Sequence, residues 1–223
     1  MIHVFAKIPP ADYALIEKMY SFSSATLHEA MDRQGAMDCS IKPIKPGSKI
    51  CGRAVTVKTH LGDNLMLHKA LAMAEAGDII VADTGMCTEA ASWGDIMSVQ
   101  AKYKGVSGLV LNGSVRDVAE IRAMDFPVYC AGVSIKGLMK DSLGTVNHPI
   151  CCGSVTVYPG DIVVADDDGV VVIPLGSAEE TIIKARQREE READMIRSIR
   201  SGERMYDMLG FAEVFERLGC IEK

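Results

Sequence analysis

The stretch IIVADTGMCTEAASWGDIMSVQAKYKGVSGLVLNGSVRD, residues 79–117, carries the pattern that indicates the fold. It opens with the apolar run 79–82, and a segment with helical character starts near Gly94-Asp95 and stops at Gly105. A second apolar run, 109–111, follows directly. Short apolar runs with a helix between them are typical of an α/β layer, so the stretch predicts a strand, a helix and a second strand.

The lengths of these elements bring the two ends of the segment 95–117 together. A helix of about ten residues spans about 15 Å, and a strand of about five residues runs back about 17 Å. Asp95 and the pair Arg116-Asp117 should therefore lie at the same end of the layer, where α/β folds commonly place their sites. We also expect a turn at Asn112-Gly113 and a short helix that begins near Asp117.

The flanking sequence continues the alternation of strands and helices. No repeat, low-complexity segment or Gly/Ser linker interrupts the first 175 residues, so residues 1–175 are predicted to form one layered α/β domain. The further expected elements are a helix capped by Ser24, a helix over 64–76, a strand over 127–130, and a β-meander over 154–158, 162–165 and 170–173.

The sequence changes character at Ser177, where a long, charge-dense helix begins and where Ser177 and Glu180 have the spacing of a capping box. A helix with so much charge has little to bury on its own domain, so it is either a solvated arm or a contact with a neighbouring subunit. An apolar stripe favours the contact, and we expect residues 176–223 to pack as a helical arm on a neighbouring subunit. The stripe consists of Met195, Ile196 and Ile199.

The composition argues against several classes of function. Lys and Arg number 24 against 30 Asp and Glu, and the net charge of −6 repels nucleic acid and anionic membranes. The sequence begins without the basic and apolar regions of a signal peptide, and no apolar run approaches the roughly 20 residues of a membrane span, so we expect a cytoplasmic protein. The seven cysteines form no CxxC pair and are expected to be reduced and mostly buried.

Asp95, Arg116 and Asp117 suit a hard divalent cation together with a small anionic substrate. Mg²⁺ prefers oxygen ligands, and arginine pairs a carboxylate through two N–H groups. Backbone N–H groups from Gly94 to Met97 would add donors beside the positive end of the helix dipole. The spacing alone also fits, and by itself favours, a capping aspartate with a solvated ion pair.

The order Gly94-Asp95, twenty residues, Arg116-Asp117 resembles the metal-binding signature of the class II pyruvate aldolases related to the regulator of ribonuclease activity A. Within that family the similarity is greatest to 4-hydroxy-4-methyl-2-oxoglutarate/4-carboxy-4-hydroxy-2-oxoadipate aldolases, because the C-terminal extension with Arg188-Glu189 and 201–203 is also present. The resemblance runs from about residue 20 to the C-terminus. Its other segments are 24–31, 62–64, 108–110, 126–128, 144–147, 159–161 and 166–170.

The resemblance implies a fold, an assembly and roles for particular residues. The fold would be a single-domain β/β/α sandwich similar to a swivelling phosphohistidine domain, assembled into trimers or hexamers with sites at subunit boundaries. Asp117 would ligate Mg²⁺ or Mn²⁺, Asp95 would hold a metal-bound water, and Arg116 would clamp the substrate carboxylate. The pyruvyl pocket would be completed by the backbone of Gly94, Asp95, Ile96 and Met97.

The long C-terminal helix would supply one further group to the implied site. Glu192 falls where the family places a carboxylate that reaches the metal through water from the neighbouring subunit. Glu189 and Glu190 lie within a turn of it and stay open as alternatives.

The implied reaction is cleavage of a 4-hydroxy-2-oxo acid to pyruvate plus pyruvate or oxaloacetate. The metal would stabilise the pyruvate enolate, and a metal-held water positioned by Asp95 would take the hydroxyl proton. The same enolate arises when oxaloacetate loses CO₂, so decarboxylation is expected as a side activity. A dedicated oxaloacetate decarboxylase and a non-catalytic regulator that binds a ribonuclease are the alternatives, and the presence of Asp117 beside Arg116 favours an enzyme.

Three further features carry weaker expectations. His68 follows Asn64 by one helical turn and could face the cleft, although a structural role is favoured. The segment 166–169 is expected to be a hairpin turn and not a calcium loop. The segments 59–62 and 86–90 differ from many aldolases of this type and could line the distal part of the pocket.

Overall fold

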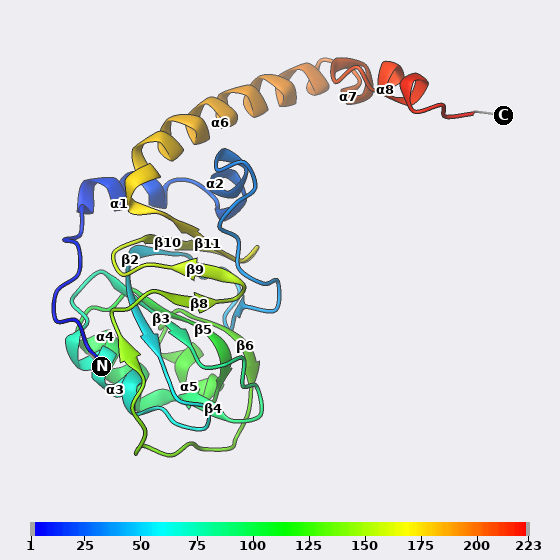
Figure 1. The fold of residues 1–223 in the computed structure, drawn as a ribbon. Coiled ribbons are helices and arrows are strands. Elements are labelled where there is room, and N and C mark those ends of the chain that lie inside the picture. Colours follow the sequence, from blue (N-terminus) through cyan, green and yellow to red (C-terminus); the bar gives the residue numbers. More distant parts are fainter. Residues whose placement is uncertain (1–2, 222–223) are drawn as a thin grey trace.

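The computed structural model describes residues 3–221, and its centre is one mixed β-sheet (Figure 1). Within these residues the sheet has nine strands: β1 (Lys42–Pro43), β2 (Ile50–Lys58), β3 (Asp78–Asp83), β4 (Ala91–Trp93), β5 (Gly108–Val115), β6 (Val128–Val133), β7 (Thr145–Val146), β10 (Ile162–Ala165) and β11 (Val170–Ile173). Seven follow the order β1-β6-β5-β3-β2-β10-β11, while β4 pairs with β5 and β7 pairs with β2. The central strands β2, β3, β5 and β6 are parallel, and β1, β10 and β11 are antiparallel to their neighbours.

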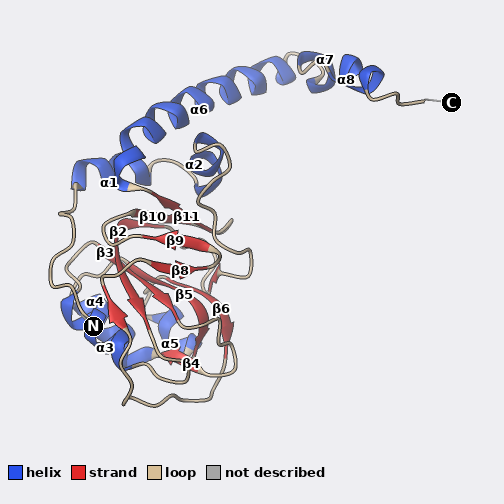
Figure 2. Cartoon of the chain, viewed as in Figure 1, coloured by secondary structure: helices blue, strands red, loops and turns tan. Residues whose placement is uncertain are grey.

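Different layers cover the two faces of this sheet (Figure 2). One face packs against α3 (Leu65–Met73), α4 (Asp95–Tyr103) and α5 (Val118–Ala123), and the other packs against a small sheet of β8 (Ile150–Cys152) and β9 (Val155–Val157). Along β3, Ile80 and Ala82 belong to the helix-side core, whereas Ile79 and Val81 belong to the core beneath the small sheet. Burial on both faces is the reason that the central strands are continuous apolar runs.

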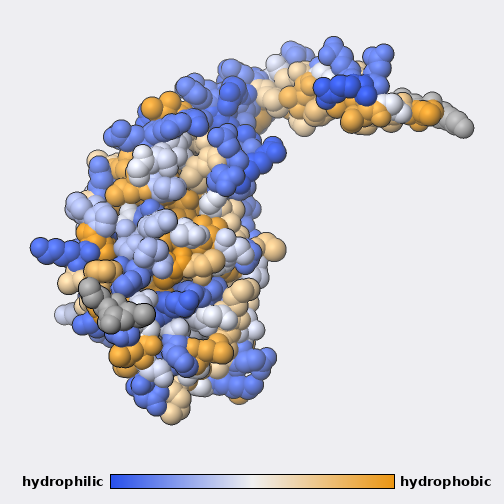
Figure 3. All heavy atoms as spheres, viewed as in Figure 1, coloured by the Kyte–Doolittle hydropathy of each residue, from blue (hydrophilic) through white to orange (hydrophobic). Residues whose placement is uncertain are grey.

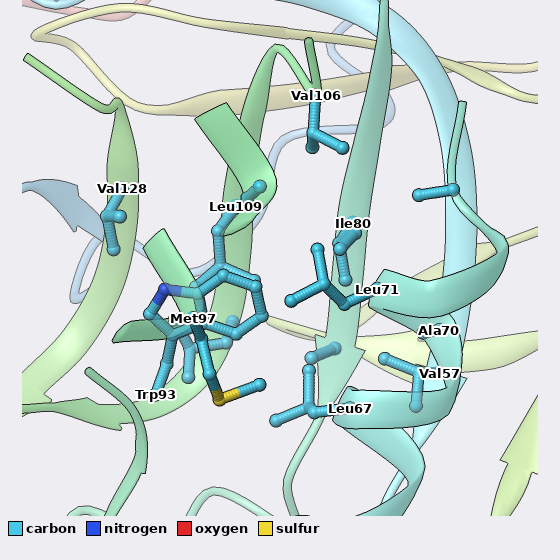
Figure 4. Packing of buried hydrophobic residues seen from close by; sticks show 14 of the residues in the cluster. Val57, Leu67, Ala70, Leu71, Ile80, Trp93, Met97, Val106, Leu109 and Val128 are labelled. Carbon is cyan, nitrogen blue, oxygen red and sulfur yellow. The ribbon is translucent and has the colours of Figure 1, made fainter. Parts of the chain in front are cut away.

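The predicted order of strand, helix and strand is confirmed by β3, α4 and β5. The helix-side core holds these elements together, and Figure 4 shows Trp93, Met97 and Leu67 among its members. The expected layers, with a long C-terminal helix, are likewise present. The similarity to swivelling phosphohistidine domains stays an expectation.

The predicted turn at Asn112-Gly113 is wrong, because both residues lie inside β5. Asn112 is buried, and its Oδ1 accepts hydrogen bonds from the backbone N–H of Thr84 at 2.7 Å and from the Thr84 hydroxyl at 3.2 Å. Its Nδ2 donates to Asp83 at 3.0 Å. At Gly113 an added Cβ would lie 2.2 Å from the Thr84 Oγ1, so glycine permits the neighbouring chain to approach. Asn112-Gly113 therefore contacts the neighbouring chain from within a strand and does not form a turn.

The predicted β-meander is only partly present. The strands β10 and β11 form the expected antiparallel hairpin, with its turn over 166–169. The preceding strand β9, however, pairs with β8 and not with β10, while β10 pairs with β2. The chain therefore leaves the small sheet and enters the large one at the turn 159–160, a change of partner that alternating strands and turns do not encode.

Two predicted helix caps also differ from the structure. Helix α2 (Ser24–Ala30) is capped by Ser23, whose hydroxyl accepts from the N–H of Thr26, whereas Ser24 bonds the carboxylate of Asp166 through its hydroxyl and its N–H. Ser177 precedes α6 (Ala178–Arg200) without a side-chain capping bond, because its hydroxyl donates to the carbonyl of Pro174 instead.

Helix α6 begins on the body of the molecule and then leaves it (Figure 1). Its first turns bury Ala178, Thr181, Ile182 and Ala185 against α1 (Tyr13–Tyr20) and α2. The later turns project from the body, followed by α7 (Met205–Met208) and α8 (Phe211–Arg217), and Figure 3 shows apolar surface near the end of this arm. The packing of the arm on a neighbouring subunit stays a prediction.

Two statements from composition can be compared with the structure over residues 3–221. No helix in this range has the length and apolar character needed to cross a membrane. All seven cysteines are free, as expected, but only three are buried. The exposed cysteines are Cys39, Cys151 and Cys220.

Candidate active site

Strand β4 and the end of β5 bring the predicted residues together. The two strands are parallel with Trp93 opposite Val115, and the N–H of Arg116 donates to the carbonyl of Trp93 at 3.0 Å. Helix α4 starts directly after β4, and α5 starts soon after β5. Gly94-Asp95 and Arg116-Asp117 therefore lie side by side at the ends of neighbouring strands, as the lengths of the elements predicted.

Contacts within this group converge on the carboxylate of Asp117. Its Oδ2 accepts hydrogen bonds from Nε of Arg116 at 3.2 Å and from the backbone N–H of Asp95 at 3.3 Å. The backbone of Asp117 has a φ of +56°, in the left-handed region, and turns the chain from β5 into α5. At Gly94 an added Cβ would lie 2.6 Å from Asp117 Oδ2. The close approach of the Asp117 carboxylate thus explains why residue 94 is a glycine.

The first residues of α4 border the site with both backbone and side chains. The Asp95 Oδ1 accepts from the N–H of Ile96 at 2.7 Å, and a carboxylate in the first turn is favoured by the helix dipole. Met97 is buried in the core next to Trp93, whereas Ile96 is exposed. Two of the four expected backbone donors, the N–H groups of Asp95 and Ile96, therefore already bond carboxylates of the site.

A pocket of about 290 Å³ opens beside these residues. One part of its lining comprises the start of α4 and Arg116, and another part comprises α3 and the segment 137–140. The Arg116 side chain is 47% exposed, so its guanidinium can hold Asp117 and still meet a ligand. The lining residues are Asn64, His68, Ala91, Trp93, Gly94, Asp95, Ile96, Met97, Arg116, Gly137, Leu138 and Lys140.

The part of the lining that comes from α3 and the residue before it contains polar groups without partners. Asn64 is buried, and its Nδ2 donates to the carbonyl of Ser92 at 2.9 Å, which leaves Oδ1 without a partner among the described residues. His68 lies one turn further along α3, and its Nε2 is likewise buried without a partner there. Burial lowers the pKa of His68, and Lys140 lowers it further. His68 lines the pocket, and the expectation of a structural role for it stays a prediction.

Asp63 fixes the segment that carries Lys140 against the start of α3. Its Oδ1 accepts from the N–H of Leu65 at 2.7 Å, and its Oδ2 accepts from the N–H groups of Asp141 and Ser142 at 2.7 and 3.0 Å. Burial opposes the charge on Asp63, but these backbone hydrogen bonds outweigh it and lower the pKa of the carboxyl group. An ionised side chain thus ties together two segments that are far apart in sequence.

The sequence contained a partial signal for this part of the lining. The one-turn spacing of Asn64 and His68 placed both on one side of a helix, but nothing in the local sequence singled out Lys140. The segments 59–62 and 86–90, expected as distal lining, contribute no residue to the pocket in the part of the chain that the structure describes.

Glu192 lies far from the pocket of its own chain. It sits on the projecting part of α6, whereas β4 lies at the opposite end of the molecule (Figure 1). Its Oε1 pairs with Nη2 of Arg188 at 2.8 Å, and Arg188 also reaches Glu29 at 3.5 Å. Only the corresponding residue of another copy could bring this carboxylate to the site.

The donor groups at the site fit a magnesium or manganese ion with few protein ligands. Across residues 3–221 no group of three or more His, Cys, Asp or Glu side chains is placed to hold a metal. Mg²⁺, however, is commonly bound by one or two carboxylates and keeps several waters. Asp117 and Asp95 provide two neighbouring carboxylates, of which Asp95 lines the pocket, and this arrangement suits such a partly hydrated ion.

Comparison with known proteins shows which family of proteins this chain resembles. The family model described as RraA-like, aldolase/RraA, matches residues 24–172. A provisionally named 4-hydroxy-4-methyl-2-oxoglutarate aldolase of Halalkalibacterium halodurans is 36% identical over 190 residues, which cover 85% of this chain and 90% of that protein.

Solved structures show the same fold. An uncharacterized protein from Pseudomonas syringae pv. tomato matches with a TM-score of 0.78 and 26% identity, over 89% of this chain and 98% of its own. Streptomyces coelicolor RraAS2, described as an unusual member of the RNase ES inhibitor RraA protein family, matches with a TM-score of 0.75 and 27% identity, over 85% of this chain and 98% of its own.

Proposed function

Because the chain belongs to the RraA-like family of aldolases and RraA proteins, we propose that it is a divalent-metal-dependent lyase that releases pyruvate from a 4-hydroxy-2-oxo acid. The substrates proposed are 4-hydroxy-4-methyl-2-oxoglutarate and 4-carboxy-4-hydroxy-2-oxoadipate, with pyruvate or oxaloacetate as the second product. The observation that carries the proposal is that Asp95 and Arg116 line one pocket and that the Asp117 carboxylate accepts hydrogen bonds from both of them.

Each of these side chains has a role that follows from its contacts. Arg116 binds Asp117 through Nε, which leaves its terminal nitrogens for the carboxylate next to the 2-oxo group. Asp117 would hold Mg²⁺ or Mn²⁺, with Asp95 acting through water. A bound metal ion would supply the Lewis acid that stabilises the enolate oxygen. The N-terminus of α4 adds the positive end of its dipole on the same side of the pocket.

A second copy of the chain would complete the site. A third carboxylate would strengthen the hold on the ion, and Glu192 stands on an arm that leaves its own body. The proposed assembly is a trimer or hexamer in which the arm brings Glu192 to a neighbour's Asp95 and Asp117. The exposed Ile196 and Ile199 would then be covered in the same contact.

Two other activities share part of this support. A dedicated oxaloacetate decarboxylase would use the same Arg116 and Asp117, because decarboxylation also passes through a pyruvate enolate. A regulatory function is suggested by the name of the Streptomyces coelicolor relative, which refers to inhibition of a ribonuclease. The paired Arg116 and Asp117 beside a pocket favour an enzyme.

The test is pyruvate release by the purified protein from 4-hydroxy-4-methyl-2-oxoglutarate and from oxaloacetate, with Mg²⁺ and with chelator. We expect metal-dependent release that falls by at least about 100-fold in Asp117→Ala and Arg116→Ala, because each removes stabilisation of the developing enolate charge. Asp125→Ala is the matched control, since Asp125 is also an aspartate with a left-handed backbone, at φ +59°, but lies outside the pocket.

The possible outcomes separate the candidates. Release from oxaloacetate alone would identify a decarboxylase. No release from either substrate, with the protein folded, would contradict the proposed lyase and favour the regulatory function.

A further inference from the structure

The peptide group between Gly94 and Asp95 is held from both of its sides. On one side, the Gly94 carbonyl accepts two hydrogen bonds from Ser98, one from its backbone N–H at 3.1 Å and one from its hydroxyl at 3.0 Å. On the other side, the Asp95 N–H donates to Asp117 Oδ2 at 3.3 Å. The C=O and N–H of a planar, trans peptide group point in opposite directions, so a bond that fixes the carbonyl also directs the N–H.

The direction of the hydrogen bonds at the Ser98 hydroxyl follows from the chemistry of its two partners. Nε1 of Trp93 lies 2.7 Å from Ser98 Oγ, and an indole N–H can only donate. The hydroxyl therefore accepts from Trp93, and its single hydrogen is left for the carbonyl of Gly94, which can only accept. Both side chains are at most 1% exposed, so solvent does not compete for these groups.

Trp93 connects this hydrogen bond to the sheet and to the helix-side core. It is the last residue of β4, which pairs with β5, and its ring stacks on Phe126 with ring centroids 6.4 Å apart. Figure 4 shows Trp93 among the packed side chains of this core. The donor that directs the Ser98 hydroxyl is therefore fixed by packing outside α4.

The backbone at Gly94 has particular need of such a restraint. Glycine has more conformational freedom than any other residue, so a peptide group next to it rotates more readily. A larger residue cannot supply the restraint, because an added Cβ would lie 2.6 Å from Asp117 Oδ2. A serine that bonds the carbonyl four residues before it is common in helices. Here, however, that carbonyl belongs to the N-cap residue of α4, and the N–H of the same peptide group reaches the site.

We infer that Ser98 is a positioning residue for the carboxylate of Asp117. Its hydroxyl, directed by Trp93, holds the Gly94–Asp95 peptide in the orientation in which the N–H of this peptide meets that carboxylate. The inference rests on the proposed function, in which Asp117 holds the metal ion. Hydrogen bonds to a ligating carboxylate orient it, and their loss typically lowers metal affinity or activity by about 10- to 100-fold.

The first measurement follows the peptide group itself and needs neither metal nor substrate. Ser98→Ala removes the hydroxyl and keeps the backbone bond to the Gly94 carbonyl. In the metal-free full chain, the amide hydrogen of Asp95 should exchange with deuterated water faster than in the wild type, because its bond to Asp117 is held less firmly. Mass spectrometry with single-residue resolution measures this rate.

Thr181→Ala is the matched control for the loss of a buried hydroxyl. Thr181 is also buried, and its hydroxyl donates at 2.9 Å to the carbonyl of Ser177, which is the N-cap residue of α6. The substitution thus removes the same kind of bond at the start of a different helix. It should leave exchange at Asp95, Mn²⁺ affinity and pyruvate release unchanged.

The second measurement follows the consequences for the site. Ser98→Ala should lower Mn²⁺ affinity, measured by calorimetry, and kcat for pyruvate release by about 10-fold or more. Trp93→Phe keeps an aromatic ring and the Ser98 hydroxyl but removes the N–H, so it should show a smaller loss of the same kind. The double variant should lose no more than Ser98→Ala alone, because both side chains act through one chain of hydrogen bonds. Trp93 is the only tryptophan, so its fluorescence reports whether its surroundings in Ser98→Ala stay buried.

Several results would overturn the inference. Exchange at Asp95 that stays at the wild-type rate in Ser98→Ala would show that the hydroxyl does not hold the peptide, and faster exchange with unchanged Mn²⁺ affinity and kcat would show that the peptide does not position Asp117. Equal losses in Thr181→Ala, or additive losses in the double variant, would also contradict it. Failure of the proposed function would look different, since the wild type would then release no pyruvate, while exchange and Mn²⁺ affinity would still decide the role of Ser98.

Discussion

Gly94 has a position in which a single methyl group would meet the central carboxylate of the site. The nearest atom to an added Cβ is Asp117 Oδ2, at 2.6 Å, followed by Nε of Arg116 at 3.2 Å. Contacts this short force one group to move. The geometry of Asp117 and Arg116 thus depends on the absence of a side chain at a residue that has no chemistry of its own.

Gly94→Ala is therefore expected to reduce activity with little loss of stability. Displacement of a catalytic group by about 1 Å can cost about 100-fold in rate, and we expect a fall of that order in kcat/KM for pyruvate release. Gly176→Ala is the control, because an added Cβ there meets no atom within 4 Å. A Gly94→Ala protein with wild-type kinetics would show that Asp117 can shift without consequence.

At the scale of the elements, the pocket depends on how α3 is joined to the segment that carries Lys140. Asp63 makes this connection, since its carboxylate accepts from Leu65 on one side and from Asp141 and Ser142 on the other. The backbone of Asn64 reinforces the connection by donating to the carbonyl of Met139 at 3.1 Å. The relative positions of Asn64, His68 and Lys140 in the pocket lining should therefore depend on the ionised carboxylate of Asp63.

Asp63→Asn should lower the free energy of unfolding at pH 7 by about 1–3 kcal/mol, because one amide NH₂ would face backbone donors. The pKa of Asp63 is lowered in the fold, so its stabilisation is complete above the unfolded pKa of about 3.9 and is lost as the pH falls through the lowered value. The measurement is denaturant unfolding of both proteins across this range. Asp141→Asn, an exposed neighbour, is the control, and a pH-independent difference would contradict the argument.

At the scale of the whole molecule, contacts within one chain do not explain the position of the arm, which consists of the later turns of α6 with α7 and α8. After Ala185 the helix α6 has no buried residue, and apolar side chains such as Ile196, Ile199 and Phe215 stay exposed. Exposed apolar surface of this kind marks an interface more often than a solvated arm. We therefore expect that a change that disrupts the assembly also leaves the site without the carboxylate of Glu192.

Removal of residues 190–223 should keep the body folded, because the buried turn of α6 ends at Ala185. We expect the shortened protein to sediment as a smaller species than the full chain and to lose most pyruvate release. In the full chain, Glu192→Gln should lower activity and metal affinity without changing the assembly. Glu189→Gln and Glu190→Gln are the controls, and a loss confined to one of these would move the role by a turn.

The sequence by itself determined the central α/β pattern and the meeting of Asp95 with Arg116 and Asp117. These follow from local properties, since apolar runs set strands and the lengths of α4 and β5 return the chain to its start. The same local reasoning misplaced a turn at Asn112-Gly113, because the contacts of Asn112 are with Thr84 and Asp83, about thirty residues away.

Only the tertiary structure decided which residues of α3 and of the segment 137–140 join the pocket lining and how the C-terminal strands pair. The carboxylate of Asp63, next to Asn64, bonds the segment that follows Lys140 across 78 residues or more. Among the strands, β9 pairs with β8, while β10 pairs with β2. Strand partners and pocket walls are set by which distant surfaces can be buried together with their polar groups satisfied. That choice depends on the whole chain and not on any one segment of it.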